Sequence, residues 1–526
     1  MSVLQRSGER GGCVYVAVII MVVAMCVVML FLHLQPWELD PSGLREPGIL
    51  TSGVSAMTEF TITVAANDSS AASKSRADYI CDGIDDQHEI QAAIDALPAR
   101  GGTVQLTEGT FNCAGSVLPR THTILKGKGD QTTHLVFTNS GLIWLKDDFI
   151  LLEGFRVTGS GYSGRSVHMG VLYITASHIG IRNITATADN SIQAVFCVHS
   201  TKEYNKNIEY ITFTGCVADE PGTFGFLHSS WDTNHKVHKN IRYTDCKAIN
   251  CGRYSAYNPW VTGFDFAELN DIENLRVTRC IAEGSFESGF HFEWGPVKRD
   301  VILTDCISRN NGQKPFPATY SLSNENYFGC GYYAPRGQYT FNNCIAEGNS
   351  AYGFFLSYPD GVYLHSCMDF ETGGGKTDYS AVKPTAFFIV QSQLTDANPS
   401  IVMEDCTSIN SHGRGLYATL VDHVQVRNFT MVNPGGIDGI GALIGDPALG
   451  GHVVNSVFDV HATGNAVKTL VSVNGATNSR ITGTIVSDVE NPVLVDGTVH
   501  GSPAVTMKIQ SGYSIVQLDQ DDRSYV

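Results

Sequence analysis

Charged residues are scarce in this sequence, and basic residues are the scarcer kind. Asp, Glu, Lys and Arg make up 17% of the 526 residues, and 35 Lys and Arg stand against 52 Asp and Glu, which gives a net charge of −17. No cluster of Lys and Arg interrupts this balance. Because phosphate contacts need such clusters, the sequence argues against a nucleic-acid partner. Plain solubility explains an acidic surface equally well.

The usual cysteine motifs are also missing. The 14 Cys include no CxxC, CxxCH or paired zinc-ligand pattern, so these patterns of zinc, redox and haem sites are excluded. Disulfides are allowed outside the cytoplasm, but the spacing of most of the Cys suggests a structural role.

One long apolar run lies near the start of the chain. Residues 14–32 hold no charged side chain, and this run is long enough to cross a bilayer as a helix. We assign 14–34 as a transmembrane anchor. Arg6 and Arg10 precede the run, so the positive-inside rule predicts a cytoplasmic N-terminus over 1–13. The rest of the chain is then expected outside the cytoplasm, on a single-pass protein of the cell membrane.

A cleaved signal peptide is the alternative to this anchor. Its apolar core would usually span about 7–15 residues, with a small-residue site close behind. The present run is followed by His33 to Trp37, and Val54-Ser55-Ala56 offers only a late site, so cleavage stays open. Residues 35–57 hold three Pro and three Gly and are predicted to be a linker.

A pattern recurs from about residue 208. A short β-rich run ends in Cys, a polar turn follows, and then Gly precedes an aromatic residue, as in Gly263-Phe264 and Gly289-Phe290, or Leu in the last copy. The cysteines that mark the copies are 23 to 39 residues apart. They are Cys216, Cys246, Cys280, Cys306, Cys344, Cys367 (in a variant copy) and Cys406.

Such spacing indicates a constant coil with insertions in its loops. Each coil is predicted to hold two or three short strands that pair in parallel with the next coil about 4.8 Å away, with Cys and aromatic ladders inside. A β-propeller would need about 40 residues and four antiparallel strands per blade, and a leucine-rich repeat would need LxxLxL, which is absent. The sequence favours an all-β fold, a right-handed parallel β-helix.

Residues 58–112 have the features of a capped first coil. Asp85 or Asp86 is expected to begin a helix, Pro98 and Gly101-Gly102 to end it, and Thr103–Leu106 to form a strand. The apolar face of this helix would hold Ile90, Ala93, Ile94 and Leu97. With residues 116–137 and the repeats, this stretch resembles the pectate-lyase-like superfamily of right-handed parallel β-helix proteins, in which a short amphipathic helix caps one end. The resemblance extends over about residues 60 to 500.

The resemblance implies the fold more strongly than an activity, because this fold hosts lyases, hydrolases, epimerases, adhesins and structural spikes. The Gly-His-Gly step of polygalacturonase-like hydrolases is absent, and Asp422-His423 is the only match to the Trp-Ile-Asp-His run of pectate lyases. Coils of the form DCIAEGN…GF are also similar in style to surface β-helix proteins of methanogenic archaea, including the polysaccharide-degrading disaggregatases.

The Gly-aromatic-x-aromatic strands predict which side chains face outward. The flanking aromatic residues point into the interior, so x points out. Asp265, His291 and Glu293 would then lie within one or two coils of each other, and we take them as candidate catalytic residues because carboxylates act as acid and base on glycosidic bonds. The outward row is predicted to be Leu227, Asp265, His291, Tyr333 and Phe355, and a second row Ser229, Ala267, Glu293, Pro335 and Ser357.

Side chains at the ends of the same strands complete a candidate sugar-binding groove. Aromatic rings would cover the apolar faces of sugars, and Ca²⁺ held by Asp265 and Glu293 is a second use of the carboxylates. The alternative is a solvated sheet face that carries charge and binds nothing. The candidate substrate-binding residues are Trp231, Trp260, Glu268, Trp294, Tyr333 and Arg336.

The end of the chain differs from its middle. From Gly435 the coils lose their Cys and aromatic ladders, so 435–526 is predicted to be the tapering end of a β-helix domain that spans 58–526, with residues 513–526 as its cap. Three sequons, at Asn67, Asn183 and Asn428, are candidate glycosylation sites.

Two functions fit these observations. The first is a membrane-anchored protein that binds and cleaves or modifies a polysaccharide or cell-surface glycan, as a lyase or glycoside hydrolase. The second is a non-catalytic structural or adhesion protein of the envelope or of a filament layer. A homo-oligomer is compatible with both.

Overall fold

The computed structural model describes residues 60–519, with gaps at 140, 163–165, 205, 231–235, 253–259, 313–328, 359, 375–383, 391–399, 436–438, 447–451, 496–503 and 511–514. All of the described residues belong to one compact unit, Val54–Val526. The predicted N-terminus, anchor and linker lie outside the described residues, as does Trp231. Within the described part, no helix has the length and apolar character needed to cross a membrane.

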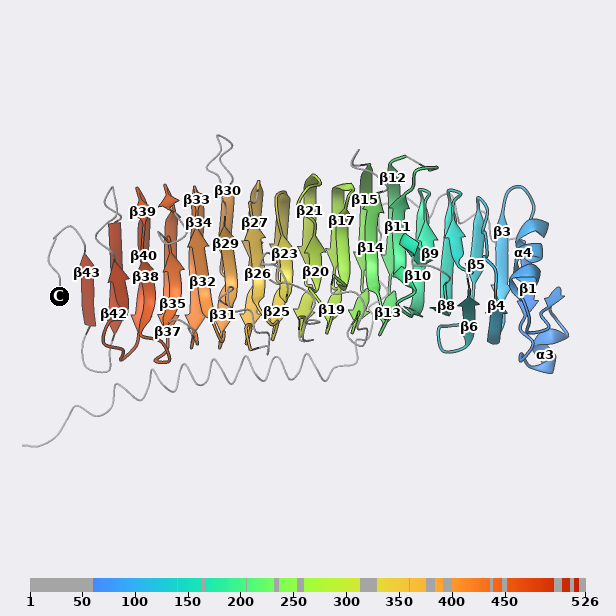
Figure 1. Ribbon diagram of the computed structural model, residues 1–526, viewed down its shortest axis with the longest axis horizontal. Coiled ribbons are helices and arrows are strands. Elements are labelled where there is room, and N and C mark those ends of the chain that lie inside the picture. The colour runs from blue at the N-terminus through green and yellow to red at the C-terminus, as the bar shows by residue number, and fades with distance from the viewer. Residues whose placement is uncertain are drawn as a thin grey trace, which may run out of the picture. The chain divides into compact units, whose positions relative to one another are not determined.

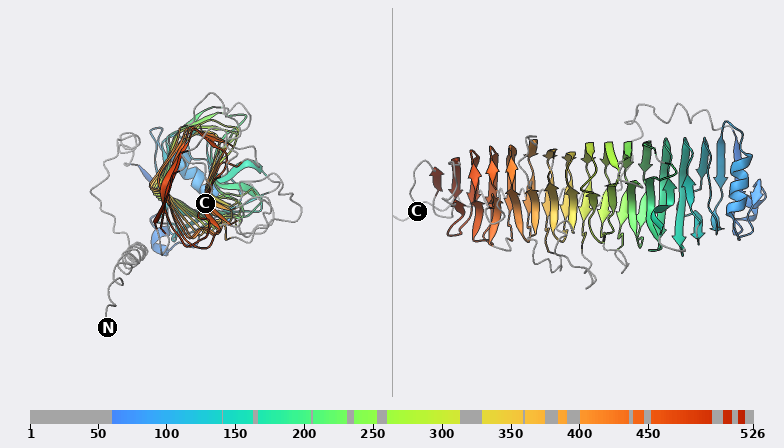
Figure 2. Two further views of the ribbon diagram at one scale, coloured as in Figure 1. Left: turned by 90° about the vertical axis from the view of Figure 1, so that its left-hand side faces the viewer. Right: turned by 45° about the horizontal axis from the view of Figure 1, so that its top comes forward.

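Each coil in the middle of this unit is built from three strands. Strand β18 (Asp271–Thr278) leads into the short β19 (Ile281–Glu283) and then β20 (Phe290–Phe292), after which β21 (Lys298–Thr304) opens the next coil. Each strand pairs in parallel with its equivalent in the next coil, as β18 does with β21. Figure 1 shows the coils in succession, and the end view in Figure 2 shows equivalent strands superposed. The predicted parallel β-helix is confirmed, and the right hand predicted for it is consistent with this pairing.

The described strands form two long sheets and one small sheet. The first sheet contains β1 (Thr61–Ala65), β2 (Tyr79–Ile80), β3 (Gly102–Leu106), β4 (Gly109–Cys113), β5 (Thr123–Lys126), β6 (Thr133–Thr138), β8 (Ile150–Ser160), β10 (Ile179–Ala188), β12 (Ile208–Thr214), β13 (Val217–Asp219), β15 (Val237–Thr244), β16 (Lys247–Ile249), β18, β19, β21, β22 (Ile307–Arg309), β24 (Gln338–Asn342), β25 (Ile345–Glu347), β27 (Gly361–His365), β28 (Met368–Phe370), β30 (Ser400–Glu404), β31 (Thr407–Ile409), β34 (Val424–Val432), β37 (Val457–Thr463), β40 (Arg480–Val486), β42 (Ala504–Gln510) and β43 (Ile515–Asp519). The second sheet contains β7 (Ile143–Leu145), β9 (Ser166–Ile174), β11 (Ile192–Ser200), β14 (Phe224–Ser230), β17 (Phe264–Glu268), β20, β23 (Cys330–Ala334), β26 (Tyr352–Ser357), β29 (Thr385–Val390), β32 (Arg414–Thr419), β35 (Ile440–Ile444), β38 (Thr469–Val473) and β41 (Val493–Val495). The small sheet contains β33 (Val421–Asp422), β36 (Val453–Val454) and β39 (Ala476–Thr477).

The interior carries the two predicted ladders. All seven repeat cysteines have no exposed surface, and all are free thiols. The aromatic ladder stacks ring on ring through successive coils, with centroids 4.7 Å apart for Phe226 and Phe264 and 4.8 Å apart for Phe264 and Phe290. These buried rings and thiols form the apolar core that no single coil could close by itself.

The two ends of the stack are closed differently. Helix α4 (Gln87–Ala96) covers the first coils with buried Ile90 and Ile94, as predicted, whereas the strand pair β42 and β43 is antiparallel at the other end (Figure 1). The prediction that an Asp side chain caps the helix is wrong for Asp86. Its carboxylate accepts from the backbone N of Gly83 and of Asn112 instead, which ties the helix start to β4.

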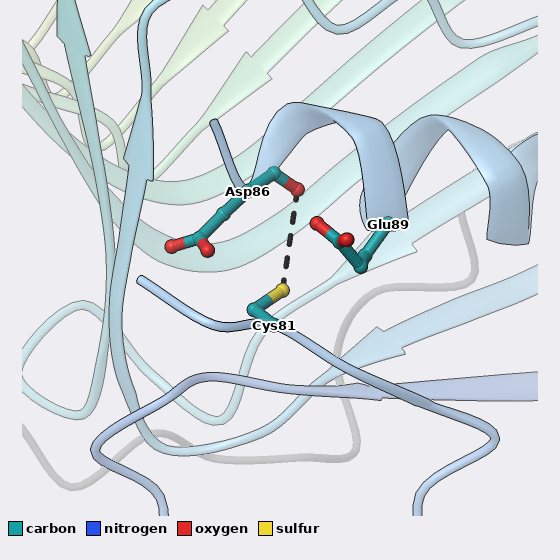
Figure 3. Close-up of side chains that lie close together, drawn as sticks. All are labelled: Cys81, Asp86 and Glu89. Carbon is teal, nitrogen blue, oxygen red and sulfur yellow. Dashed lines mark hydrogen bonds between the residues drawn. The ribbon is translucent and has the colours of Figure 1, made fainter. Parts of the chain in front are cut away.

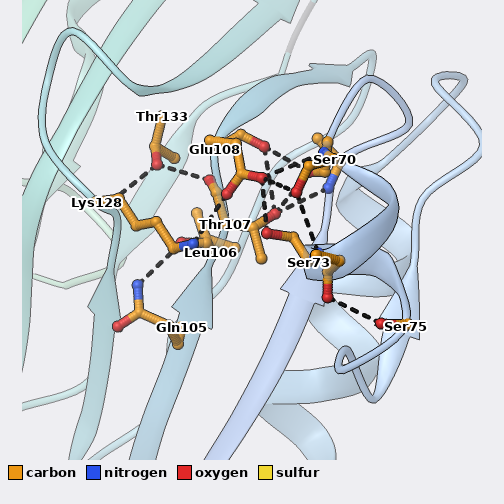
Figure 4. Close-up of polar contacts among 12 residues, drawn as sticks. Ser70, Ser73, Ser75, Gln105, Leu106, Thr107, Glu108, Lys128 and Thr133 are labelled. Atoms are coloured by element: carbon orange, nitrogen blue, oxygen red, sulfur yellow. Dashed lines mark hydrogen bonds and ion pairs between the residues drawn. The ribbon is translucent and has the colours of Figure 1, made fainter.

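A second short helix, α3 (Ala71–Lys74), was not predicted. Figure 4 shows what holds it against the first coil. The Glu108 carboxylate accepts from the hydroxyls of Ser70 (2.8 Å) and Ser73 (2.6 Å) and pairs with Lys128 (2.9 Å). These contacts, with the Ser73 hydroxyl first, lower the pKa of Glu108 well below its usual value, so the carboxylate stays charged and holds the helix in place.

Candidate functional site

The predicted outward row of the second sheet exists in the expected register. Asp265 on β17 pairs with His291 on β20, and His291 pairs with Tyr333 on β23. Their neighbours Phe264 and Phe290 stack in the interior, so Asp265 and His291 must project from the opposite face. Only Gly fits before Phe290, because a Cβ at Gly289 would run into the side chain of Ser308.

The second outward row was predicted wrongly at one position. Leu227 pairs with Asp265, but Ser229 pairs with Glu268, because an irregularity in the register adds a residue to β17. A bulge of this kind re-aims the side chains that follow it. Glu268, and not Ala267, therefore takes the position beside Ser229.

The outward row is also far less exposed than a solvated sheet face would be. Asp265 is 2% exposed, His291 1% and Tyr333 5%. Phe355 joins Tyr333 in a separate apolar cluster and is likewise 5% exposed, so these two rings offer little surface to a ligand. Trp260 is half-buried and packs against the main core.

Two of the predicted binding residues are exposed. Trp294 is 43% exposed, with its ring edge-on to Tyr358 at 4.4 Å. The Arg336 guanidinium lies 3.9 Å from the Asp360 carboxylate and is mostly in solvent. Trp294 directly follows Glu293 and donates its backbone N–H to the Glu293 carboxylate (3.2 Å), so it is the predicted binding residue nearest the candidate catalytic carboxylate in the chain.

His291 lies at the centre of a group of acids, which we call the acid cluster: Asp265, Glu268, Glu287, His291 and Glu293. His291 Nδ1 is 3.0 Å from Glu287 Oε1, and its Nε2 is 3.6 Å from Glu293 Oε1. The Glu287 side chain is 2% exposed, whereas that of Glu293 is 38% exposed. Glu293 is thus the side of the cluster that a ligand can reach.

Burial and mutual charge set the protonation of the cluster. Burial alone would lower the pKa of His291, but the facing carboxylates of Glu287, Glu293 and Asp265 raise it well above its usual value. Burial raises the pKa of Asp265 well above its usual value, and burial with the charge of Glu293 raises that of Glu268 to about 7. Burial also acts to raise the pKa of Glu293, but contact with His291 holds it below its usual value. These shifts favour the charged form of His291 and the ionised form of Glu293, and they disfavour the ionised forms of Asp265 and Glu268.

Glu287 and Lys298 belong to the site but were missed from the sequence. The Lys298 side chain is buried at the start of β21, its Nζ donates to the backbone O of Glu293 (2.5 Å), and burial lowers its pKa to about 8. Both residues lie outside the Gly-aromatic strands on which the prediction was based. The one available signal for Glu287 was its position four residues before His291.

Among the described residues, the acid cluster is not a set whose ligand atoms converge on one point. In the part of the chain that the structure describes, one set of three His, Cys or acidic side chains brings its ligand atoms within 4.8 Å of one another: Cys81, Asp86 and Glu89 under α4 (Figure 3). In that set both Asp86 oxygens already accept backbone N–H groups. The Ca²⁺ predicted between Asp265 and Glu293 stays a prediction.

The three sequon residues are exposed. Asn67, Asn183 and Asn428 all lie at the surface, and Asn428 Nδ2 donates to Asp405 Oδ1 (2.7 Å) on the preceding coil. Exposure is what a glycan attachment site needs, and glycosylation itself stays a prediction.

No family model and no curated protein sequence matches the chain. Among solved structures, the chain is similar to the catalytic unit of a GH87 α-1,3-glucanase from Streptomyces thermodiastaticus (10% identity, 81% of this chain and 65% of that one, TM-score 0.40). It is also similar to the A-module of the mannuronan C-5 epimerase AlgE4 from Azotobacter vinelandii (14% identity, 80% and 96%, TM-score 0.39). A third similar structure is pectate lyase Pel9A (13% identity, 64% and 77%, TM-score 0.35). The chain spans 65% of the length of the glucanase unit.

Proposed function

We propose that the protein is a membrane-anchored polysaccharide-cleaving β-helix protein of the glycoside hydrolase type, with its active site at the acid cluster. The observation that carries this proposal is that the pKa values of two carboxyl groups of the acid cluster are shifted in opposite directions. Glu268 has a pKa of about 7, and Glu293 has a pKa below its usual value. Glycoside hydrolysis needs one carboxylic acid that keeps its proton and one carboxylate that does not.

The roles follow from these protonation states. Glu268 would donate its proton to the leaving oxygen of the glycosidic bond. Glu293, the more exposed acid, would activate water or attack the sugar carbon as the carboxylate. His291 is a positioning residue, because it contacts Glu293 and keeps it ionised, and Glu287 keeps His291 charged. Trp294 is suited to contact a sugar ring beside Glu293.

Cleavage is tested with the full chain in detergent on a panel of neutral, basic and acidic polysaccharides, measured as new reducing ends. We expect Glu293→Gln and Glu268→Gln each to lower kcat by about 100-fold or more. The matched control is Glu347→Gln, which changes an exposed carboxylate on β25 of the first sheet and should leave kcat unchanged. Products without an unsaturated sugar would separate hydrolysis from a lyase reaction.

The pH profile gives a second test. Because Glu268 must keep its proton, kcat should fall as the pH rises through about 7, and Glu268→Gln should lose this limb. Full activity in Glu293→Gln would refute the proposal. Binding of glycans without cleavage of any of them would favour the non-catalytic adhesion or structural role.

The membrane anchor is part of the proposal and rests on residues 14–34 of the sequence. We expect the full chain to sediment with membranes and to need detergent for release. A chain that begins at residue 35 should stay in the supernatant. Release of the full chain by salt alone would argue against the anchor, and a shortened chain in the supernatant would argue for cleavage.

A further inference from the structure

Two buried histidines beside the acid cluster have no part in the proposed cleavage. His228 on β14 and His238 on β15 are both fully buried. Strand β14 belongs to the second sheet and β15 to the first, so the two rings meet between the sheets. Their Nδ1 atoms are 3.1 Å apart, which is hydrogen-bond distance. Ser229, the residue after His228, pairs with Glu268 of the acid cluster, so this contact lies next to the candidate active site.

The two rings are the middle of a chain of four hydrogen-bonded side chains, which we call the histidine chain: Tyr243, His228, His238 and Ser200. The Tyr243 hydroxyl is 2.7 Å from His228 Nε2, and Ser200 Oγ is 3.2 Å from His238 Nε2. Ser200 Oγ also donates to the backbone O of Lys206 (2.8 Å). The histidine chain therefore joins β11, β14 and β15, which are strands of both long sheets.

The position of each proton in the histidine chain follows from its last acceptor. A backbone carbonyl only accepts, so the Ser200 proton points to Lys206, and Ser200 must accept from His238 Nε2. A neutral imidazole has one donor and one acceptor nitrogen, so His238 Nδ1 accepts from His228 Nδ1, and His228 Nε2 accepts from Tyr243. With both imidazoles neutral, each contact of the histidine chain holds one proton.

A further proton breaks this order. Either both Nδ1 atoms carry hydrogen and face each other at 3.1 Å, or His228 turns a second N–H to Tyr243, whose own proton then loses its acceptor. Each outcome leaves a buried donor without the hydrogen bond that it had. A buried group in that state destabilises the strands that carry it.

The surroundings of the two rings do not stabilise a positive charge. The titratable groups that face them are Tyr243 on β15 and His199 on β11. Burial, with the charge of His228 and His199, lowers the pKa of His238 well below its usual value, and burial lowers the pKa of His228 to about 3. Among the described residues, no carboxylate acts on these rings as Glu287 does on His291. Apolar side chains flank the rings on adjoining coils: Ile208, Ile272, Val198 and Phe266.

We propose that the histidine chain is an acid-sensitive switch, which holds β14 and β15 together at neutral pH and releases them as the pH falls toward 5. When these strands open, both imidazoles reach water and take up protons near their ordinary pKa of 6.5. The stability that the pair contributes is therefore complete above about pH 7 and is lost as the pH falls. Glu268 has the opposite effect, because its raised pKa stabilises the fold as the pH falls.

Hydrogen exchange of the full chain in detergent tests the switch without any need for cleavage. Peptides are analysed by mass spectrometry at pH 7 and pH 5, and the rates are corrected for the intrinsic effect of pH. Each imidazole that is freed should raise the opening constant of β14 and β15 by about 25-fold between these pH values, so two should raise it by about 600-fold. Peptides from β37 and β40, where His461 is already partly exposed, should change far less.

Two variants separate the buried pair from other effects of acid. His228→Gln leaves one titrating imidazole, so the change should fall to about 25-fold, whereas the matched control His461→Gln should keep the full change. A full change in His228→Gln would overturn the inference. Equal loss of protection in all peptides, or no loss at β14 and β15, would also overturn it, and the native chain decides this even if His228→Gln does not fold. None of these results affects the test of cleavage, which uses Glu268 and Glu293.

Discussion

Charged side chains on successive coils are arranged in opposite ways on the two long sheets. On the first sheet and its turns, opposite charges alternate between coils, as in Arg276 with Asp300 (2.7 Å) and Arg309 with Glu283 (2.7 Å), and the pairs are partly exposed. On the second sheet, acids gather around His291 and are mostly buried. Exposed ion pairs of the first kind lose little solvation and contribute little to the free energy of folding. Buried acids of the second kind lose solvation and repel one another, which lowers stability, and groups with such strongly shifted pKa values occur most often at functional sites.

The largest effect should come from removing the central cation of the acid cluster. His291→Ala would leave Glu287 and Glu293 without their positive partner, and breaking a buried pair from one side typically costs about 3–5 kcal/mol. The free energy of unfolding from denaturant titration measures this loss. The control on the first sheet is His365→Ala, because His365 is 42% exposed and 3.9 Å from Asp405, and it should cost no more than about 1 kcal/mol. Equal losses for the two variants would remove the contrast between the sheets.

The next effect concerns pH. The pKa of Glu268 is raised to about 7 by burial and by Glu293, so its contribution to stability is fully present below its ordinary pKa and is lost as the pH rises through about 7. Glu268→Gln lacks this loss. Relative to the native chain, the variant should therefore gain stability between about pH 4 and pH 7, on the order of 3 kcal/mol in all. Thermal unfolding at a series of pH values measures the difference.

Glu404 on the first sheet should give the opposite sign. Its carboxylate accepts from the Tyr363 hydroxyl (2.7 Å) and pairs with Arg427, and these contacts lower its pKa. The stability that Glu404 contributes is present above its ordinary pKa and is lost as the pH falls through the lowered value. Glu404→Gln should thus be less stable than the native chain at neutral pH and match it in acid. The same sign for Glu268→Gln and Glu404→Gln would contradict the comparison.

The repeated sequence pattern predicts the coils and the interior of the β-helix, but it predicts only part of the acid cluster. The frame of Cys, turn and Gly-aromatic step is local and repeated, so it predicts the coils, the interior ladders and the outward direction of Asp265 and His291. Glu268 depends on one extra residue in β17, which strict alternation along a strand cannot show. Burial of the acid cluster depends on contacts between segments far apart in the chain, and the outward pattern of a strand is the same whether or not that face is covered. Lys298 is only five residues from Glu293 and was missed for another reason, because it lies at the start of β21, outside the Gly-aromatic strands.

The smallest effect should come from the best-formed charge pair of the first sheet. Arg279 Nε and Nη2 donate to the two carboxylate oxygens of Asp245 at 2.8 and 2.9 Å, from one inter-strand turn to the next, with both side chains nearly half exposed. Although this geometry is bidentate, water and salt screen the pair, so Arg279→Ala should cost no more than about 1 kcal/mol. A double-mutant cycle with Asp245→Ala at low and high salt isolates the pair, and the coupling energy should shrink as salt is added. A coupling as large as the loss in His291→Ala, or one that salt does not change, would mean that both sheets use their charges in the same way.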